Sequence, residues 1–212
     1  MMKILVLPAL FTACVAEPGP TTASTDQDLS SRTSCPANVP AALAPAADQD
    51  LSFSLDAVGT QNYICAANAT GYAWTFVAPE AQLYRDRHEC RHDEAIVHHF
   101  AGPTWQSLDD GSSVVGAKVA GVTVDATAIP WLLLTAASHG APTGDGDNDE
   151  DDAAGLMTPI TSIQRLSTQN GLAPSTGCDA TTVGATADVP YTATYMFYRS
   201  RPNHTHNVRC GG

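Results

Sequence analysis

Basic side chains are scarce in this chain of 212 residues: 10 Lys and Arg stand against 22 Asp and Glu, a formal net charge of −12. Nucleic acids and anionic membrane surfaces both attract Lys and Arg, so both are disfavoured as partners. Charged residues of either sign amount to only 15%, below the roughly 25% of an average domain. The charge therefore indicates solubility more than it indicates any partner.

Several sequence motifs of enzymes are absent as well. No GxGxxG follows a strand-like segment, so no helix N-terminus is prepared for the pyrophosphate of a dinucleotide. Ser112 does not lie in a GxSxG elbow that would activate it as a nucleophile. The cysteines form neither the CxxC pairs of a zinc ribbon nor the CxxCH of a haem protein. Strand-like and helix-like segments do not alternate, which argues against a parallel sheet.

The N-terminus has the pattern of an export signal. Lys3 precedes an apolar run over residues 4–12, which is too short to span a bilayer, and small Ala13 precedes Cys14. Residues 10–14 resemble the lipobox of bacterial lipoproteins, so we predict a lipoprotein-type signal over residues 1–14 and a membrane anchor through acylated Cys14. The alternative is an ordinary signal peptide cut slightly later. We expect an outer-membrane or cell-surface lipoprotein, or otherwise a secreted or periplasmic protein.

The rest of the chain divides into a tether, a domain and a tail. Residues 15–50 are rich in Pro, Ala, Ser and Thr without apolar periodicity, which predicts a flexible, disordered tether. A β-rich domain is expected over residues 51–199, and a short C-terminal tail over residues 200–212. At the start of the domain, Leu51, Phe53 and Leu55 alternate with polar residues, the period of a half-buried strand.

Short strand patterns separated by turn residues continue through the domain. A hairpin is expected around a turn at residues 68–71, with Gly at its end. Later strand candidates are residues 113–124, 131–136, 160–166 and 191–198, and in the last of these Tyr191, Ala193, Tyr195 and Phe197 share one face. Residues 80–100 compete as a helix, but their apolar residues form no helical stripe. We therefore predict an all-β fold, an antiparallel sandwich or a distorted barrel.

Five cysteines follow Cys14, namely Cys35, Cys65, Cys90, Cys178 and Cys210. In an exported protein most of them should form disulfides, and an odd number leaves one over. Cys35 and Cys210 flank the domain and would join its ends if these lie close together, as domain termini often do.

Several motifs resemble, in order over roughly residues 38–199, the family called domain of unknown function 3455. They are VGTQNYIC at 58–65, Trp74 with APEA at 78–81, HFAGPTW at 99–105, DGS at 110–112, IPWLLL at 129–134, SIQR at 162–165, GLAP at 171–174, GCDA at 177–180 and VPYTATY at 189–195. The family has no established activity. Some relatives carry a malate dehydrogenase label, which we reject here because the dinucleotide motif is missing. Cys65 and Cys178 both lie in family-like motifs, which implies that they pair and that Cys90 is the odd thiol.

The same resemblance singles out His99, Trp105, Asp110 and Arg165 as candidate ligand-binding residues. Trp105 is either a platform for a sugar ring, which would make an extracellular glycan the ligand, or a core residue. Trp131 lies in a continuous apolar run and is expected in the core. His99 is more often a structural histidine in such a setting than a catalyst.

A zinc motif competes with this interpretation. His88, Glu89 and His92 fit HExxH, in which two histidines bind zinc and the glutamate is the general base. His98 extends the motif toward the metzincin protease signature, with Ala95 in place of the usual Gly. The family resemblance places this stretch between two strands, where it cannot form the required helix, so we keep the zinc hydrolase as the alternative.

The acidic segment beginning at residue 145 offers a weaker metal site. Asp145, Asp147 and Asp149 alternate like the first ligands of a calcium loop, but Glu150 occupies the place of the required Gly. A solvated acidic loop is preferred. We expect no cofactor, with zinc and calcium as minor alternatives, and a non-enzymatic envelope protein whose domain either binds an extracellular ligand or is purely structural.

Overall fold

The computed structural model describes residues 36, 38–85, 94–143 and 155–201, all within one compact unit that spans residues 33–212. Eight strands account for most of them. They are β1 (Gln49–Asn68), β2 (Gly71–Tyr84), β3 (Val97–Phe100), β4 (Thr104–Ser107), β5 (Ser113–Val122), β6 (Trp131–Gly140), β7 (Ile160–Asn170) and β8 (Thr186–Ser200). The one helical element in the described ranges is a short 3-10 turn, η1 (Ala41–Leu43).

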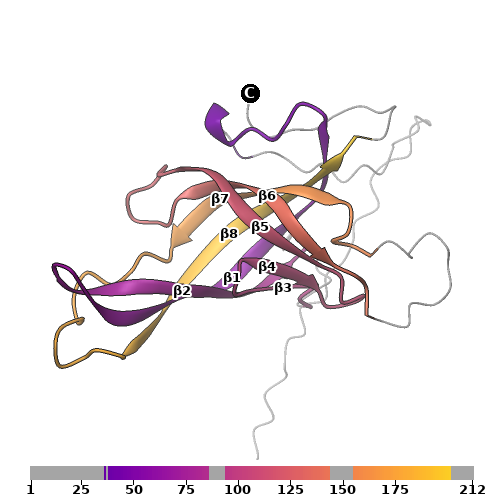
Figure 1. Ribbon diagram of the computed structural model, residues 1–212. Coiled ribbons are helices and arrows are strands. Elements are labelled where there is room, and N and C mark those ends of the chain that lie inside the picture. The colour runs from indigo at the N-terminus through magenta and orange to yellow at the C-terminus, as the bar shows by residue number, and fades with distance from the viewer. Residues whose placement is uncertain (1–35, 37, 86–93, 144–154, 202–212) are drawn as a thin grey trace, which may run out of the picture. The chain divides into compact units, whose positions relative to one another are not determined.

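Each strand pairs antiparallel with the next along the chain, and β1 pairs with β8, which closes the sheet into a ring (Figure 1). The closure is uneven. β1 and β8 pair from Gln49↔Ser200 to Ile64↔Thr186, whereas β2 and β3 pair only over Ala81–Leu83. The all-β antiparallel prediction is confirmed, and of its two forms the structure has the distorted barrel.

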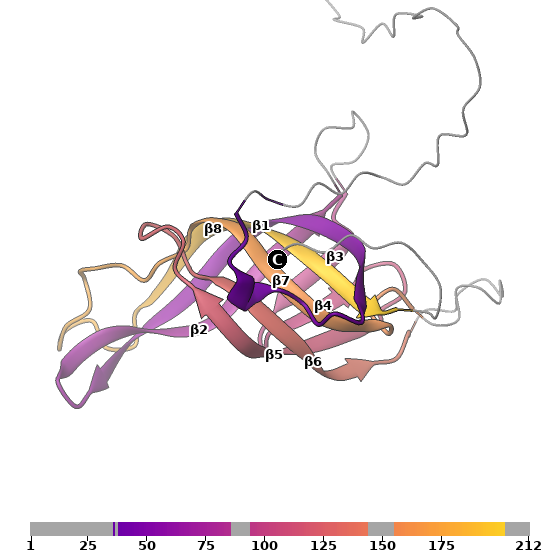
Figure 2. The same ribbon diagram turned by 90° about the horizontal axis from the view of Figure 1, so that it is seen from above.

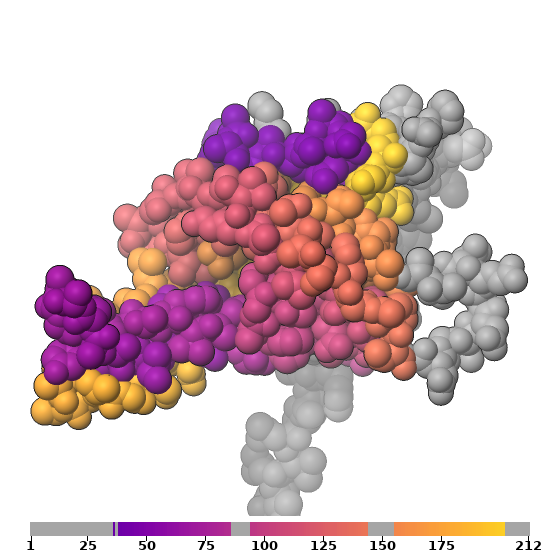
Figure 3. Space-filling view, viewed as in Figure 1, coloured from indigo at the N-terminus to yellow at the C-terminus, as the bar shows by residue number. Residues whose placement is uncertain are grey.

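The strand directions determine at which end of the barrel each connection lies. Because neighbouring strands alternate in direction, the β1–β2, β3–β4, β5–β6 and β7–β8 connections share one end, which we call the hairpin end. Both β1 and β2 run beyond the barrel wall there, and the connection between β7 and β8 lies beside them (Figure 1). The surface is hollowed between this projecting pair and the β5–β6 connection (Figure 3).

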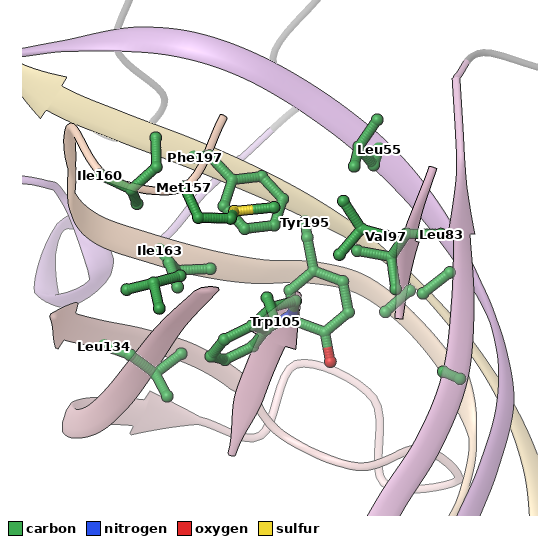
Figure 4. Packing of buried hydrophobic residues seen from close by; sticks show 14 of the residues in the cluster. Leu55, Leu83, Val97, Trp105, Leu134, Met157, Ile160, Ile163, Tyr195 and Phe197 are labelled. Atoms are coloured by element: carbon green, nitrogen blue, oxygen red, sulfur yellow. The ribbon is translucent and has the colours of Figure 1, made fainter. Parts of the chain in front are cut away.

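The barrel interior holds the larger of two hydrophobic clusters. Alternate residues of each strand point inward, and the predicted face of Tyr191, Ala193, Tyr195 and Phe197 is buried in this cluster. Figure 4 shows its centre, where Trp105 of β4 lies beside Tyr195. Trp105 also packs on Gly116 of β5, where a Cβ atom would lie 2.9 Å from its ring. A side chain at residue 116 would therefore displace the indole.

A second hydrophobic cluster lies on the outer face of the barrel. It contains Leu43, Trp131, Leu133, Leu166, Met196 and Tyr198. The segment over residues 38–48 crosses this face (Figure 2) and inserts Leu43, which is fully buried, a burial that stabilises by about 1.5–3 kcal/mol. These residues belong to the predicted tether, but they pack here as part of the domain. Trp131 is a core residue, as expected.

The pattern at the start of β1 needs one correction. Leu51, Phe53 and Leu55 were expected on one face, but the β1–β8 register shifts between Leu51 and Phe53. The bulge turns Leu51 toward the outer cluster, while Phe53 and Leu55 pack inside. The alternation is therefore genuine only from Phe53 onward.

The predicted hairpin and one predicted disulfide are confirmed. The expected hairpin is the β1–β2 turn, with Asn68 paired to Gly71. Cys65 and Cys178 form the disulfide that the family motifs implied, with Cα atoms 5.3 Å apart, and it ties β1 to the β7–β8 connection. In the stretch from 80 to 100, β2 continues to Tyr84 and β3 begins at Val97, so both described flanks are strands.

No helix in the described part of the chain has the length and apolar character needed to cross a membrane.

Candidate functional site

Six polar side chains gather inside the barrel toward the hairpin end. This inner polar cluster consists of Gln61, Tyr63, His99, Arg165, Tyr191 and Tyr195. Strand alternation accounts for it, because Gln61 and Tyr63 continue the inward face of Leu55 and Ala57 on β1, and Arg165 of β7 lies opposite Tyr195 of β8. A polar set at the mouth of a barrel is a common place for ligands.

The tyrosines of the cluster are tied to the end of β7. The Tyr63 hydroxyl donates to the carbonyl of Gly171 at 2.6 Å, and the hydroxyls of Tyr191 and Tyr195 lie 3.3 Å apart. Gly171 has φ +81°, and a Cβ on it would lie 2.9 Å from the Cβ of Tyr191 and 3.2 Å from the Cγ of Gln61. Only glycine fits this conformation and this close approach, so Gly171 covers the cluster from the hairpin end.

Arg165 is the cation of the cluster. Its Nε and Nη2 donate to the carbonyl of Pro130 at 3.2 and 2.9 Å, which fixes the guanidinium. No carboxylate among the described residues lies within 4 Å of it. Burial raises the pKa of Tyr191 and Tyr195. The Arg165 charge and the neighbouring Gln61 amide offset part of that rise for Tyr191, and the charge and side chain of Arg165 offset part of it for Tyr195. Both phenols are therefore protonated at neutral pH, and the guanidinium charge is balanced by no anion in this part of the molecule.

His99 is held neutral. It is 2% exposed, and burial, with a smaller effect of Arg165, lowers its pKa from 6.5 to about 3. Its Nδ1 lies 2.8 Å from the carbonyl oxygen of Thr104. Because a carbonyl only accepts, Nδ1 carries the proton and Nε2 is left as an acceptor. The ring stacks on Trp105 with centroids 4.2 Å apart and planes 7° apart.

Two buried donors in this region lack a hydrogen-bond acceptor. They are Nε2 of Gln61 and Nε1 of Trp105, on side chains that are 3% and 1% exposed. Buried polar atoms are nearly always hydrogen-bonded, because an unmatched donor costs about 1–3 kcal/mol. Within the inner polar cluster, the donor without a well-aligned acceptor among the described residues is therefore Nε2 of Gln61, whose amide lies beside the Tyr191 hydroxyl.

Comparison with known proteins agrees with the motifs and the fold. A family model described as "Protein of unknown function (DUF3455)" matches residues 45–199, most of the chain. The chain belongs to the DUF3455 family. No curated protein and no solved structure matches it.

Two of the four predicted ligand-binding residues of this DUF3455 chain lie together, and a third acts on them. His99 and Trp105 are stacked, and the charge of Arg165 acts on His99. Trp105 is fully inside the core, so its ring offers no open platform for a sugar. Asp110 is not part of this group.

Asp110 lies in the β4–β5 turn, at the end of the barrel opposite the hairpin end. Its two carboxylate oxygens accept the backbone N–H groups of Ser112 and Leu156, each at 2.7 Å. Burial raises its pKa, but these hydrogen bonds lower it more. Ser112 accepts the N–H of Met157 at 3.0 Å, so both residues hold the connection between β6 and β7.

The predicted metal sites are described only in part. His98 of β3 lies on the outer face, 2.5 Å from a carboxylate oxygen of Glu80. Within the described ranges, no group of three or more His, Cys, Asp or Glu side chains is arranged to hold a metal. The other predicted residues lie outside those ranges: His88, Glu89 and His92; Asp145, Asp147 and Asp149; Cys14, Cys35, Cys90 and Cys210.

Four members of the inner polar cluster were not predicted: Gln61, Tyr63, Tyr191 and Tyr195. Tyr191 and Tyr195 were expected inside, but as core residues. The available signal was Gln61, a polar residue at a position where the alternation of Leu55 and Ala57 calls for an apolar one. A polar side chain at an inward position of a barrel strand marks a structural network or a binding site.

Proposed function

We propose that this DUF3455 chain is an exported envelope protein, attached to a membrane through acylated Cys14, whose barrel binds a small extracellular ligand in the inner polar cluster. The function is binding without catalysis. The N-terminal signal pattern supports export and anchoring, and the cluster supports binding.

The unpartnered Nε2 of Gln61 carries the binding proposal. A barrel needed only as a structural element is most stable when its interior is apolar or its polar groups are matched. Here a cation, an unmatched amide and protonated phenols share one interior region. A ligand with hydrogen-bond acceptors would satisfy these donors.

The chemistry of the cluster favours binding over catalysis. The phenols of Tyr191 and Tyr195 have raised pKa values and are poor bases. His99 is neutral and commits its Nδ1 proton to Thr104. The alternative, a zinc hydrolase that uses His88, Glu89 and His92, rests on the sequence motif only.

A surface glycan would need a different part of the molecule. Trp105 is buried, whereas Tyr72 and Phe76 on the projecting β1–β2 pair are 44% and 50% exposed and present aromatic rings to solvent. If Tyr72→Ala abolished glycan binding and Gln61→Leu did not, the ligand would bind at the surface and not in the interior.

Native mass spectrometry of the full-length chain, purified from a bacterial envelope, tests the binding function. We expect a co-purifying small molecule that is depleted in Gln61→Leu and retained in Gln169→Leu. Gln169 is a matched control because it is an exposed glutamine near the end of β7. A ligand-free chain that no compound in a small-molecule thermal-shift screen stabilises would refute the binding function.

Anchoring is tested separately, by growth of expressing cells with labelled palmitate. The expected result is a labelled chain in the membrane fraction and loss of both label and membrane association on Cys14→Ser. Cys90→Ser, which removes a different predicted free thiol, should change neither. An unlabelled wild-type chain in the soluble envelope fraction would favour the ordinary signal peptide.

A further inference from the structure

We propose that the ligand is a small monocarboxylate, whose carboxylate group binds the guanidinium of Arg165 inside the barrel. This inference rests on the proposed binding function and names the chemical class of the ligand.

The balance of charge in the inner polar cluster calls for one negative charge. Arg165 is the only cluster member that is charged at neutral pH, since the tyrosines are protonated and His99 is neutral. Among the described residues no acid pairs with it. Arg165 is half-buried, and a partly desolvated charge is stabilised by an opposite charge beside it. A monoanion neutralises the cluster, whereas a dianion such as phosphate would leave one excess negative charge.

The direction of the guanidinium favours a planar, two-oxygen group. Pro130 takes the Nε and Nη2 donors on one edge. The donors that remain are on Nη1 and the second hydrogen of Nη2, along the adjoining edge of the guanidinium, and the Arg165 side chain also contacts the Tyr195 hydroxyl. A carboxylate matches that edge with two parallel hydrogen bonds.

Further donors surround the same region. Gln61 supplies an unpartnered Nε2. Only one of the Tyr191 and Tyr195 hydroxyls donates within their mutual contact, so the other keeps a hydrogen for a ligand. A carboxylate accepts at about four lone-pair positions, and it can therefore satisfy all of these donors where a neutral amide or alcohol cannot.

The neighbouring side chains determine the polarity expected of the rest of the ligand. Ile129 packs at Gly171 beside Gln61, and Trp105 lies edge-on to Tyr195 with ring centroids 5.4 Å apart. These surfaces are apolar or aromatic. The body of the ligand is accordingly uncharged and apolar, and a second charged group would find no partner among them.

The test is a thermal-shift and calorimetric titration of the full-length chain with matched panels. One panel holds acetate, propionate, butyrate, benzoate and phenylacetate, and the other holds the corresponding amides. We expect at least one carboxylate to bind and its amide to bind at least about ten-fold more weakly. Arg165→Met should abolish this preference, and Arg165→Lys should weaken carboxylate binding because the charge remains and the fork is lost.

Arg199→Met is the matched control, since Arg199 is an exposed arginine on the neighbouring strand β8, and it should bind like the wild type. If Arg165→Met fails to fold, Gln61→Leu replaces it and should weaken carboxylate binding. Amides that bind as well as acids would overturn the carboxylate assignment while leaving the binding function standing. Carboxylate binding retained in Arg165→Met would overturn the site. If no compound of either panel bound, the ligand class would be overturned.

Discussion

The two halves of the barrel interior are built from different residues. Toward the end that carries the β4–β5 and β6–β7 connections, the interior is mostly apolar, with Phe53, Met157, Ile160, Ile163 and Phe197 packed together beside the buried hydroxyl of Ser112. Toward the hairpin end it holds the inner polar cluster, with Arg165 and Gln61 among protonated tyrosines. Both halves lie along the same strands: β7 contributes Ile163 to one and Arg165 to the other.

This difference separates stability from function within a single sheet. The apolar half excludes water and stabilises the fold by burial. The polar half leaves donors unmatched and so costs stability, which is the usual signature of a site kept for a ligand. Substitutions in the two halves should therefore have opposite consequences for unfolding and for binding.

The largest effect is expected in the apolar half. Phe197 is fully buried and stacks on Phe53 with ring centroids 4.7 Å apart. Phe197→Ala should lower the free energy of unfolding by about 3–5 kcal/mol, because it removes buried area and leaves a cavity. Urea unfolding of the full-length chain measures this. A loss below about 1 kcal/mol would mean that the apolar half does not carry the fold.

The disulfide should have the next largest effect. Cys65–Cys178 closes a loop of 113 residues in sequence separation, and the double variant Cys65→Ser/Cys178→Ser should lose about 2–4 kcal/mol of stability. Urea unfolding under non-reducing conditions provides the comparison, with Cys90→Ser as the control. Equal stability of the double variant and the wild type would show that β1 holds the β7–β8 connection without the bond.

The buried histidine predicts a specific dependence on pH. His99 has a pKa of about 3 in the fold and 6.5 when unfolded, so between these values the unfolded chain binds the extra proton. Stability is complete above about pH 6.5 and falls as the pH is lowered toward 3, by at most about 1.4 kcal/mol per pH unit. Urea midpoints at several pH values report it.

A histidine variant completes this test. His99→Gln, whose amide can still donate to Thr104, should flatten the slope between pH 5 and 6.5. An unaltered slope in His99→Gln would place the titration elsewhere.

The smallest effect on stability is expected in the polar half. Gln61→Leu replaces an unpartnered amide with an apolar group of similar size, so the free energy of unfolding should change by less than about 1 kcal/mol or rise. Binding, in contrast, should be weakened. A large loss of stability would show that Gln61 has a structural partner, and the two halves would then serve the same purpose.

Much of the fold follows from patterns in the sequence, but not all of it. Period-two alternation found the inward face from Tyr191 to Phe197 and the hairpin around Gly71. It missed β3 and β4, which have four residues each, too few for a period to stand out. The pattern also predicted the wrong face of the sheet for Leu51, because a bulge moves a side chain to the other face without changing the residue types. Leu43 was assigned to the tether since its partners, such as Trp131, are distant in sequence.

The site was less predictable than the fold. Family motifs pointed to His99, Trp105 and Arg165, which the structure brings into one region, but they also pointed to Asp110, which caps a turn at the other end. Gln61 and Tyr63 lie in a motif as well, yet only the closed ring shows that they face Arg165 across the interior. Closure of a sheet by β1 and β8 is a long-range property that local patterns do not encode.

The three indole N–H signals of the full-length chain test the central claim most directly. Trp105 lies inside the barrel, Trp131 lies in the outer cluster, and Trp74 on the projecting strand donates to the carbonyl of Thr176. In a proton–nitrogen correlation spectrum, titration with the tightest-binding carboxylate of the panel should shift the Trp105 signal and leave the other two in place. A Trp105 signal that stays fixed at saturation while Trp74 or Trp131 moves would contradict binding inside the barrel.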